Sequence, residues 1–544
     1  MKKRKVVIVG GGSAGWMTAA YLNGALNKRG TESNVDIELV ESPDIPRISV
    51  GEATIPSMRH LLAVVGVDEM DFMKATDATF KQSIKYCNWV QNDNTFYHHP
   101  FSSMRLQPID RAGMDWLKSD RSIPFMETCS AQPLICEWGL SPLMLGPWDM
   151  GARFNYAYHM NAQKFADYLR DFSVERGVIH TLANVTSVDM QSEKRIRAVH
   201  TDRDQCIEGD IFVDCTGFKA KLIEEKMAVG FEDCSQWLLC DRAITMHIPY
   251  DRFYPGMIRP YTTATALSSG WIWDIPMRSQ RSVGYVHSSH FIDIDAAEAE
   301  MRAYQGGDTA DLKSRVVHFK VGRRCGNWHG NCIAIGLSGG FIEPLESTGL
   351  YLSDLGAVLL AEYFPYADQE MDILASRYNR IMSNRFYEIL DFINMHYCMT
   401  QRTDTPFWRE VQKPERITDR LKAKLEFWRI KPPSSHDFQD QWFAGMPVTS
   451  SGADSYAHAD GRPAVDTGGL WNHESYECIL YGMNFLQQEC IDRYGAERPQ
   501  TEVHPAILKR LQLARQKLPP HAVWLDKVFG MPDYKTAFKP AGWI

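Results

Sequence analysis

The chain has 544 residues, of which 44% are hydrophobic and 23% charged, and its formal net charge is −8. This length can bury at least one large core and suggests two or more structural units. No run of Lys and Arg extends beyond Lys2–Lys5, so the mildly acidic composition gives no support for nucleic acid as a partner.

The cysteines and the apolar runs indicate the compartment. The twelve cysteines form no CxxC pair, and they occur singly, as at Cys87, Cys215 and Cys332. This pattern is typical of reduced thiols and gives no metal site. The apolar run Val6–Val9 ends at three glycines, so it is too short for a secretory signal, and no later run is long enough to span a membrane. The sequence predicts a soluble, cytoplasmic protein.

The first forty residues predict an α/β fold. A short apolar run, Lys5–Val9, has the length and composition of a buried strand, and a glycine-rich turn follows it. Trp16–Lys28 has helical spacing, and Val35–Val40 is a second apolar run that ends in Glu41. The order strand, turn, helix, strand indicates a right-handed, parallel βαβ unit of the Rossmann type.

The remaining elements alternate between strand and helix. Residues 60–150 are rich in aromatic residues without a long clean period, so we expect an irregular layer around a pocket. Residues 240–290 alternate like an antiparallel sheet, and the pattern after about residue 370 is mainly helical apart from Ser434–Gly469. The other expected elements are a helix at Ala162–Arg176, strands within Val178–Val213, a strand at Cys332–Gly336 and a helix at Leu350–Phe364.

The expected elements suggest a nucleotide-binding module built from separated pieces of the chain. We assign residues 1–60, 152–220 and 320–365 to this module. Residues 61–151 and 221–319 are then inserted β-sheet and substrate-site segments, and residues 366–544 form a mainly helical C-terminal region that covers the substrate.

The turn after the first strand has the GxGxxG pattern at Gly10, Gly12 and Gly15. The first glycine permits a tight turn, the second lets a pyrophosphate approach the backbone, and the third permits close packing of helix on strand. The helix N-terminus offers N–H groups to phosphate, and Glu41 can accept hydrogen bonds from ribose hydroxyls. The element therefore predicts a dinucleotide site.

The βαβ unit alone does not separate FAD from NAD. Asp214–Gly217 and Gly336–Gly340 are two further turns that each follow a buried strand. They favour FAD, because the extended form of FAD touches several loops, although each one taken separately can be an ordinary strand-to-loop glycine.

Three later segments, Val50–Pro56, Trp271–Pro276 and Phe341–Gly349, read VGEATIP, WIWDIP and FIEPLESTG. They resemble the loop over the flavin, the WxWxIP motif and the FxxPxxSxG motif of flavin-dependent tryptophan halogenases, and they occur in the family's order. WxWxIP discriminates best, because flavin monooxygenases that share the fold generally lack it.

The resemblance implies a reaction. A partner flavin reductase supplies FADH2, and FADH2, O2 and chloride or bromide give hypohalous acid at the flavin. The acid passes through an internal tunnel to an electron-rich arene. The resemblance also implies that FAD contacts the following positions in this chain: Gly10, Gly12, Ser13, Ala14, Gly15, Glu41, Glu52, Ala53, Val185, Leu337 and Leu350.

By position, Lys81 corresponds to the family's catalytic lysine and Glu346 to its catalytic glutamate. An enclosed lysine can bind or capture hypohalous acid, and a carboxylate can stabilise and deprotonate the cationic intermediate of aromatic substitution. Without the resemblance, the sequence favours a solvated lysine on a helix at Lys81, with Lys85 four residues on. Glu346 reads as a capping carboxylate, and Glu343 competes for its role.

The same resemblance implies that Thr348 and Gly349 bind the halide, because a turn at a helix N-terminus presents N–H groups to an anion. An ordinary N-cap at Thr348 is equally compatible with the pattern. Trp271 and Trp273 are implied to separate flavin from substrate, and they are also typical of a core strand.

His99 and Phe101 resemble the pair that faces the indole ring in the family. A structural histidine remains an alternative, and the adjacent His98 makes a metal pair conceivable without suggesting a third ligand. The lid departs from the family, since Thr449–Ser455 is small and polar where paired tyrosines are expected. Tryptophan, indole, an indole derivative or another aromatic therefore stay open as substrates.

Three other functions are alternatives to the halogenase. An aromatic monooxygenase shares the flavin class, and a flavin-binding protein without turnover shares the fold. An NAD-dependent dehydrogenase does not account for the later motifs. A homodimer is an expectation from the family only.

Overall fold

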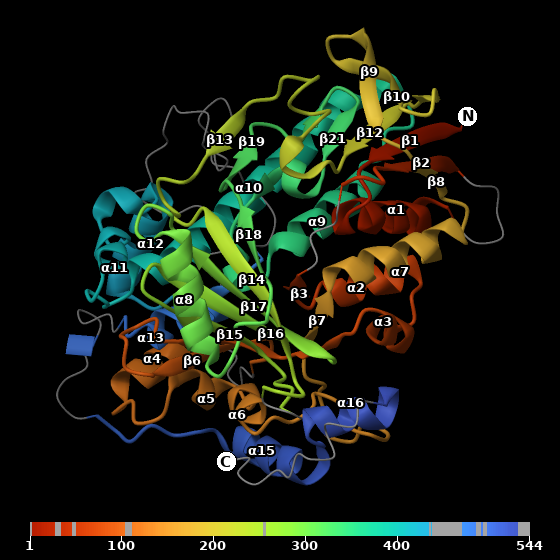
Figure 1. Cartoon of the computed structure of the whole chain (residues 1–544). Coiled ribbons are helices and arrows are strands. Elements are labelled where there is room, and N and C mark those ends of the chain that lie inside the picture. Colours follow the sequence, from red (N-terminus) through yellow and green to blue (C-terminus); the bar gives the residue numbers. More distant parts are fainter. Residues whose placement is uncertain are drawn as a thin grey trace. The chain divides into compact units, whose positions relative to one another are not determined.

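The computed structural model describes residues 3–27, 34–45, 50–103, 111–253, 257–434, 437, 470–485, 491–492 and 498–530 (Figure 1). The chain forms two compact units, each assembled from three segments. The first unit comprises Met1–Ala78, Met160–Ser235 and Phe319–Phe386. The second unit comprises Thr79–His159, Gln236–His318 and Tyr387–Ile544.

The first unit contains a six-stranded sheet in the order β20-β21-β12-β1-β2-β8. Its strands are β1 (Arg4–Val9), β2 (Val35–Glu41), β8 (Ile179–Leu182), β12 (Ile211–Asp214), β20 (Trp328–His329) and β21 (Cys332–Ala334). Strand β1 lies parallel to both β2 and β12, and β20 alone pairs antiparallel. The predicted βαβ unit is confirmed. Helix α1 (Ser13–Leu26) begins three residues before Trp16, because the N–H of Trp16 already closes a helical turn on Gly12 O.

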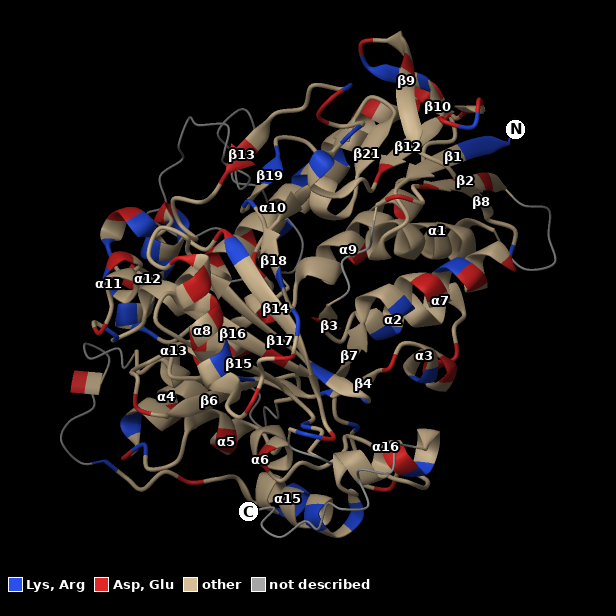
Figure 2. Cartoon of the chain, in the orientation of Figure 1, with Lys and Arg blue, Asp and Glu red and all other residues tan. Residues whose placement is uncertain are grey.

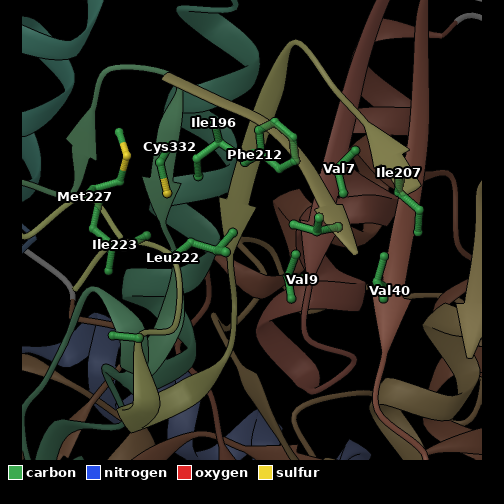
Figure 3. Packing of buried hydrophobic residues seen from close by; sticks show 13 residues of the cluster. Val7, Val9, Val40, Ile196, Ile207, Phe212, Leu222, Ile223, Met227 and Cys332 are labelled. Carbon is green, nitrogen blue, oxygen red and sulfur yellow. The ribbon is translucent and has the colours of Figure 1, made fainter. Parts of the chain in front are cut away.

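One core cluster of this unit lies on one face of the sheet. Figure 3 shows side chains from neighbouring strands meeting there, with Val7, Phe212 and Cys332 in register across β1, β12 and β21. All three are fully buried. Burial of such side chains contributes about 1.5–3 kcal/mol each, so the apolar pattern of these short strands stabilises the sheet that carries the glycine turn.

Helix α1 packs against the same sheet. Helix α1 packs against α7 (Ala162–Val174) and α9 (Gly349–Glu362). These two helices confirm the expectations at Ala162–Arg176 and Leu350–Phe364, with ends shifted by one or two residues. The other elements of the unit are α2 (Met58–Val65), α3 (Glu69–Ala75), β3 (Gly51–Ala53), the β11-β10-β9 sheet (Cys206–Glu208, Arg195–Thr201, Val185–Ser192) and the β13-β19-β22 sheet (Phe231–Asp233, Gly322–Arg324, Gly340–Phe341).

The second unit is built on a seven-stranded sheet in the order β18-β14-β17-β16-β15-β5-β6. The strands are β5 (Ser83–Cys87), β6 (Phe96–Pro100), β14 (Arg242–Pro249), β15 (Thr262–Ala266), β16 (Gly270–Pro276), β17 (Gln280–His287) and β18 (Ser314–His318). The alternation in residues 240–290 is confirmed as antiparallel pairing of β14, β17, β16 and β15. Strand β5 joins β15 in parallel, and that pairing brings residues 83–87 into this sheet.

Short helices lie within residues 111–137, where an irregular layer was expected, and α8 follows β17. Helices also dominate the described residues after 370, which confirms the helical expectation there. The helices in these regions are α4 (Ala112–Lys118), α5 (Phe125–Cys129), α6 (Gln132–Glu137), α8 (Ile294–Gln305), α10 (Met371–Cys398), α11 (Pro406–Glu410), α12 (Asp419–Ile430), α13 (His473–Gly482), α15 (Pro505–Lys517) and α16 (His521–Phe529). No helix in the described part of the chain is long and apolar enough to cross a membrane. In Figure 2 the ribbon of α7 carries the colours of both basic and acidic residues.

Candidate active site

The glycine turn fits a pyrophosphate. Gly10 has φ +117°, and a Cβ there would lie 2.2 Å from the carbonyl oxygen of Cys215. A Cβ at Gly15 would lie 1.9 Å from Gly10 O, whereas a Cβ at Gly12 would meet no described atom within 4 Å. Gly10 and Gly15 are therefore required by packing. Gly12 leaves open space before the N-terminus of α1, where backbone N–H groups can donate to an anion.

Glu41 is fixed in place at the end of β2. Its Oε2 accepts hydrogen bonds from Trp16 Nε1 at 3.2 Å and from His180 Nε2 at 3.1 Å. A Cβ at Gly11 would lie 2.1 Å from Glu41 Cδ, so the middle glycine is needed to seat this carboxylate. The sequence did not single out Gly11, Trp16 or His180. With Oε2 held by two donors, Oε1 can accept from a ribose hydroxyl.

The second glycine turn lies against the nucleotide helix. Gly336 has φ +80°, and a Cβ there would lie 2.6 Å from Ala14 Cβ. Leu337 is in the 3-10 turn η2 (Gly336–Ser338), and Leu350 is in the first turn of α9. A dinucleotide on α1 therefore has a second turn beside it, as the extended form of FAD requires.

The other positions expected to touch FAD lie in the same unit. Glu52 and Ala53 are in β3, and Val185 begins β9. Desolvation raises the pKa of the Glu52 carboxyl to about 7. This carboxyl can therefore carry a proton near neutral pH, and a protonated carboxyl can donate a hydrogen bond to a ligand.

The FxxPxxSxG segment forms a strained turn before α9. Pro344–Glu346 is a 3-10 turn, η3, and Ser347 after it has φ +60°, a left-handed conformation that costs a non-glycine residue about 1–2 kcal/mol. Strain of this kind persists where the surroundings fix it, and it clusters at functional sites. Thr348 is the N-cap residue of α9, but its side chain makes no cap hydrogen bond.

Thr348 and Gly349 fit a small anion. The Thr348 side chain is 1% exposed, and its hydroxyl has no hydrogen-bond partner among the described residues. Gly349 is exposed, and a Cβ there would meet no described atom within 4 Å. A buried donor without an acceptor is costly unless a ligand supplies one. The turn at the start of α9 therefore has both the room and the donors for a halide ion.

Glu346 is buried on the preceding turn and is 2% exposed. Glu343 is fully buried three residues earlier. Thr348, not Glu346, is the N-cap residue of α9, and a capping carboxylate near that helix stays an alternative for Glu346. Burial alone does not separate the two glutamates, so Glu346 as the catalytic carboxylate stays a prediction.

Lys81 lies in the short strand β4 (Thr79–Lys81) and is fully buried. The alternative of a solvated helix lysine is therefore wrong, because β4 pairs antiparallel with residues 157–159 of β7 (Ala157–Asn161). Lys81 Nζ lies 5.0 Å from the centre of the Phe101 ring.

The neighbouring lysine has a different environment. Lys85 Nζ donates to both carboxylate oxygens of Glu137 at 2.8 Å. Of these two lysines, Lys81 is the one beside the ring of Phe101.

The WxWxIP segment forms β16. Trp271 and Trp273 are 1% and 8% exposed, with ring centres 6.3 Å apart. A Cβ at Gly284 of β17 would lie 2.1 Å from the Trp273 ring, so Gly284 makes the room for that indole. Sequence reasoning missed Gly284. The two tryptophans are core residues of the second unit, and their role as a wall between flavin and substrate stays a prediction.

His99 and His98 point to opposite faces of β6. His98 bonds Ser83 Oγ at 2.9 Å and Glu137 Oε1 at 2.9 Å, while His99 pairs with Ile84 on the other face. Adjacent strand residues diverge in this way, so the metal pair is not formed. Within the described ranges, no group of three or more His, Cys, Asp or Glu could hold a metal ion.

An aromatic row extends from His99. Its ring centre lies 5.8 Å from that of Phe392 on α10, and Phe392 stacks on Trp471 with ring centres 4.0 Å apart at 10°. The sequence did not indicate Phe392. The expected lid segment, residues 449–455, lies outside the described residues.

The structure thus brings the predicted residues together in two sets. The first unit holds the glycine turn, Glu41, and the Glu346–Leu350 turn. The second unit holds Lys81 with Phe101, and His99 in its aromatic row. A glycine turn on a parallel sheet, with a second glycine turn and an open helix N-terminus in the same unit, defines a dinucleotide-binding protein and fits FAD.

Comparison with known proteins names the family. Residues 5–498 match the family model described as tryptophan halogenase, and the chain belongs to this family. It is 34% identical to a tryptophan 6-halogenase from Streptomyces albogriseolus over 93% of this chain and 94% of that protein. It is 33% identical to a tryptophan 7-halogenase from Lentzea aerocolonigenes over 95% of this chain and 97% of the relative.

A solved structure shares the whole fold. The tryptophan halogenase from Shewanella frigidimarina superimposes with a TM-score of 0.84 and 31% identity, covering 97% of this chain and 98% of that one. The chain is accordingly a flavin-dependent halogenase that uses FADH2 and halide. It requires a separate flavin reductase and an aromatic substrate.

Proposed function

We propose that this enzyme halogenates an indole-type arene, with Lys81 and Glu346 acting at the substrate. The overall change has two balanced stages. In the first, FADH2, O2, halide and a proton give FAD, hypohalous acid and water. In the second, hypohalous acid exchanges its halogen for one hydrogen of the arene, and the hydroxyl leaves with that hydrogen as water.

Bound FADH2 supplies the two electrons that activate O2 for the first stage. The chain contributes the binding residues: the Gly10–Gly15 turn for the pyrophosphate, Glu41 for the ribose, and the turns carrying Leu337 and Leu350. Thr348 and Gly349 hold the halide by donors at the start of α9, where the helix dipole favours an anion. We assign residues 1–60, 152–220 and 320–365 to this FAD module.

The observation that carries the second stage is the buried Lys81 beside Phe101. An enclosed amine can hydrogen-bond hypohalous acid or take its halogen as a haloamine, and either form directs the halogen to a nearby arene. The carboxylate of Glu346 stabilises the positive charge of the ring intermediate and can accept the displaced proton. Trp271 and Trp273 separate the arene from the flavin.

The substrate class follows from the aromatic lining and from the relatives. Phe101 and His99 offer faces for a flat, electron-rich ring. Relatives named as tryptophan 6- and 7-halogenases act on an indole ring. An indole-type arene is the substrate that fits both, and a homodimer is the expected assembly.

Mass spectrometry tests this function. The protein is incubated with FAD, a flavin reductase, bromide or chloride, and a panel containing tryptophan, indole and indole derivatives. A mass shift of one halogen for one hydrogen supports the proposal. An oxygenated product would instead identify a monooxygenase, and unchanged substrates in every arm would indicate a flavin-binding protein without this activity.

A further inference from the structure

Two buried histidines contact the strand that carries Lys81. His159 on β7 lies within 3.1 Å of Thr79 Oγ1, and His521, the first residue of α16, accepts a hydrogen bond from the Phe80 N–H at 3.2 Å. Both imidazoles are fully buried. Neither histidine belongs to the motifs of the proposed reaction.

The hydrogen bonds fix the tautomer of His159. Thr79 donates its only hydroxyl hydrogen to the carbonyl of Pro276 at 2.5 Å, so it can only accept from the imidazole. His159 Nδ1–H therefore donates to Thr79, and His159 Nε2 accepts from the hydroxyl of Thr262 at 2.9 Å. A neutral imidazole at His159 thus satisfies all three of these hydrogen bonds.

His521 has the same tautomer for a different reason. Its Nδ1–H donates to the carbonyl of Ile258 at 3.0 Å, which leaves Nε2 as the acceptor for the Phe80 N–H. The N-terminal position of His521 on α16 also disfavours a positive charge. Protonation of Nε2 would remove this acceptor and leave the Phe80 N–H buried without one.

Electrostatics favour the neutral form of both rings. Burial lowers the pKa of His159 well below its ordinary value, the charge of Lys81 lowers it further, and so does His521 when it is protonated. Burial likewise lowers the pKa of His521 to about 4. At neutral pH, two uncharged imidazoles therefore bond the strand of Lys81: His159 donates to the Thr79 hydroxyl, and His521 accepts from the Phe80 N–H.

We propose that His159 and His521 are positioning residues that hold β4, and through it the amine of Lys81, at the place where the halogen is passed to the arene. They act on the two residues before Lys81: one ring bonds the side chain of Thr79 and the other bonds the main chain of Phe80. This role rests on the proposed function of Lys81.

The packing around β4 makes the hydrogen bonds decisive for orientation. The ring of Phe80 is already enclosed by Tyr156 and Trp524, with ring centres 4.9 and 4.8 Å away. Apolar contacts of this kind keep the strand buried, but they are not directional. Besides the antiparallel pairing of β4 with β7, the bond to His521 restrains the direction of Phe80. An error of about 1 Å at a reacting group can cost a hundredfold in rate.

The test uses the full chain and two independent measurements. His521→Phe keeps a ring but removes the acceptor, while His521→Gln keeps an acceptor. His287→Gln is the matched control, because His287 is also a fully buried histidine of the same unit. It lies on β17, and its Nδ1 bonds the carbonyl of Tyr285. Hydrogen–deuterium exchange of the peptide covering residues 78–82 is measured without cofactor. Halogenated product and hypohalous acid trapped by monochlorodimedone are measured in the turnover mixture.

We expect hydrogen–deuterium exchange at residues 78–82 to be faster in His521→Phe than in the wild type. In His521→Gln the exchange rate should return toward that of the wild type. In turnover, the ratio of halogenated product to trapped hypohalous acid should fall about tenfold to a hundredfold in His521→Phe. His287→Gln should change neither quantity. If His521→Phe does not fold, Thr262→Val, which removes the donor to His159, should shift both readouts in the same direction.

Unchanged exchange at residues 78–82 would overturn the proposal. So would a fall in product and in trapped hypohalous acid by the same factor, because that pattern indicates only a loss of folded enzyme. If the wild-type chain halogenates none of the panel, the proposed function fails, and the exchange measurement still decides whether His521 holds β4.

Discussion

Thr79 donates its hydroxyl to the carbonyl oxygen of Pro276 at 2.5 Å, and this bond joins the strand of Lys81 to the last residue of the WxWxIP strand. Two motifs separated by almost 200 residues therefore share one hydrogen bond. The bond gives the WxWxIP segment a structural task besides the burial of its tryptophans, since its C-terminal end helps to fix β4.

Substitution of each lysine by arginine should distinguish the catalytic role of Lys81 from the structural role of Lys85. Arginine keeps the charge but remains protonated, so it cannot act as the neutral amine. Lys81→Arg should lower halogenation by about a hundredfold or more, in the range of a lost general acid–base group. Lys85→Arg can still bind Glu137 and should keep activity within about threefold. Product formation by mass spectrometry, with FAD binding as the folding control, is the measurement. Equal losses in both variants would contradict the role of Lys81.

Removal of the Thr348 hydroxyl should weaken halide binding without weakening the fold. Thr348→Val removes a buried donor that has no partner among the described residues, so stability should stay the same or rise by about 1 kcal/mol. The KM for halide should rise about tenfold, the effect of losing one hydrogen bond to a charged ligand.

Thr76→Val is the matched control for this change, because Thr76 is a buried threonine whose hydroxyl donates to Phe72 O at 2.8 Å. This variant should lose about 1 kcal/mol of stability and keep the halide KM. Thermal unfolding and halide titration of the turnover rate check both variants. A halide KM unaffected by Thr348→Val would remove its side chain from the halide site.

Acid should destabilise the protein through His521. Its pKa is about 4 in the folded chain against an ordinary 6.5, so the unfolded chain binds the extra proton between these values. The free energy of unfolding therefore decreases as the pH falls from about 6.5 to about 4, by about 3 kcal/mol from this group. Urea unfolding at several pH values measures this free energy. Between pH 6.5 and 4 it should change more steeply with pH in the wild type than in His521→Gln. Parallel curves for the two proteins would contradict the shifted pKa.

The buried Asp354 on α9 predicts the opposite dependence. Burial raises the pKa of this carboxyl from 3.8 to about 7, so its contribution to stability is full below about 3.8 and is lost as the pH rises to about 7. Asp354→Asn removes the cost of ionising a buried group. At pH 8 the variant should be more stable by up to about 4 kcal/mol, and at pH 4 the two should be equal within about 1 kcal/mol. Thermal unfolding at both pH values decides this, and a variant that is less stable at pH 8 would refute it.

The elements that could be predicted from the sequence are those whose residue pattern depends on near neighbours in the chain. The βαβ unit has its glycine pattern, helix spacing and closing carboxylate within forty residues, and each depends on neighbours along the chain. The antiparallel strands in residues 240–290 were predictable for the same reason, because side chains alternate between two faces.

The environment of Lys81 was not predictable from its own segment. Strand β4 has only three residues, and its partners are His159, Pro276 and His521. A strand so short has no periodicity of its own, and long-range pairing decides its conformation. The stack of Phe392 on Trp471 escaped prediction likewise, since nothing in either segment points to the other.

The hydrogen bond between Phe80 and His521 spans 441 positions. During synthesis the last segment of the first unit, which ends at Phe386, leaves the ribosome well before His521 does. Domains tend to fold as they emerge, so a nascent or prematurely ended chain has every segment of the nucleotide-binding unit before it has the residue that completes β4. A chain truncated between residues 387 and 520 would thus keep every segment of the first unit and lose the hydrogen bond that His521 makes to β4.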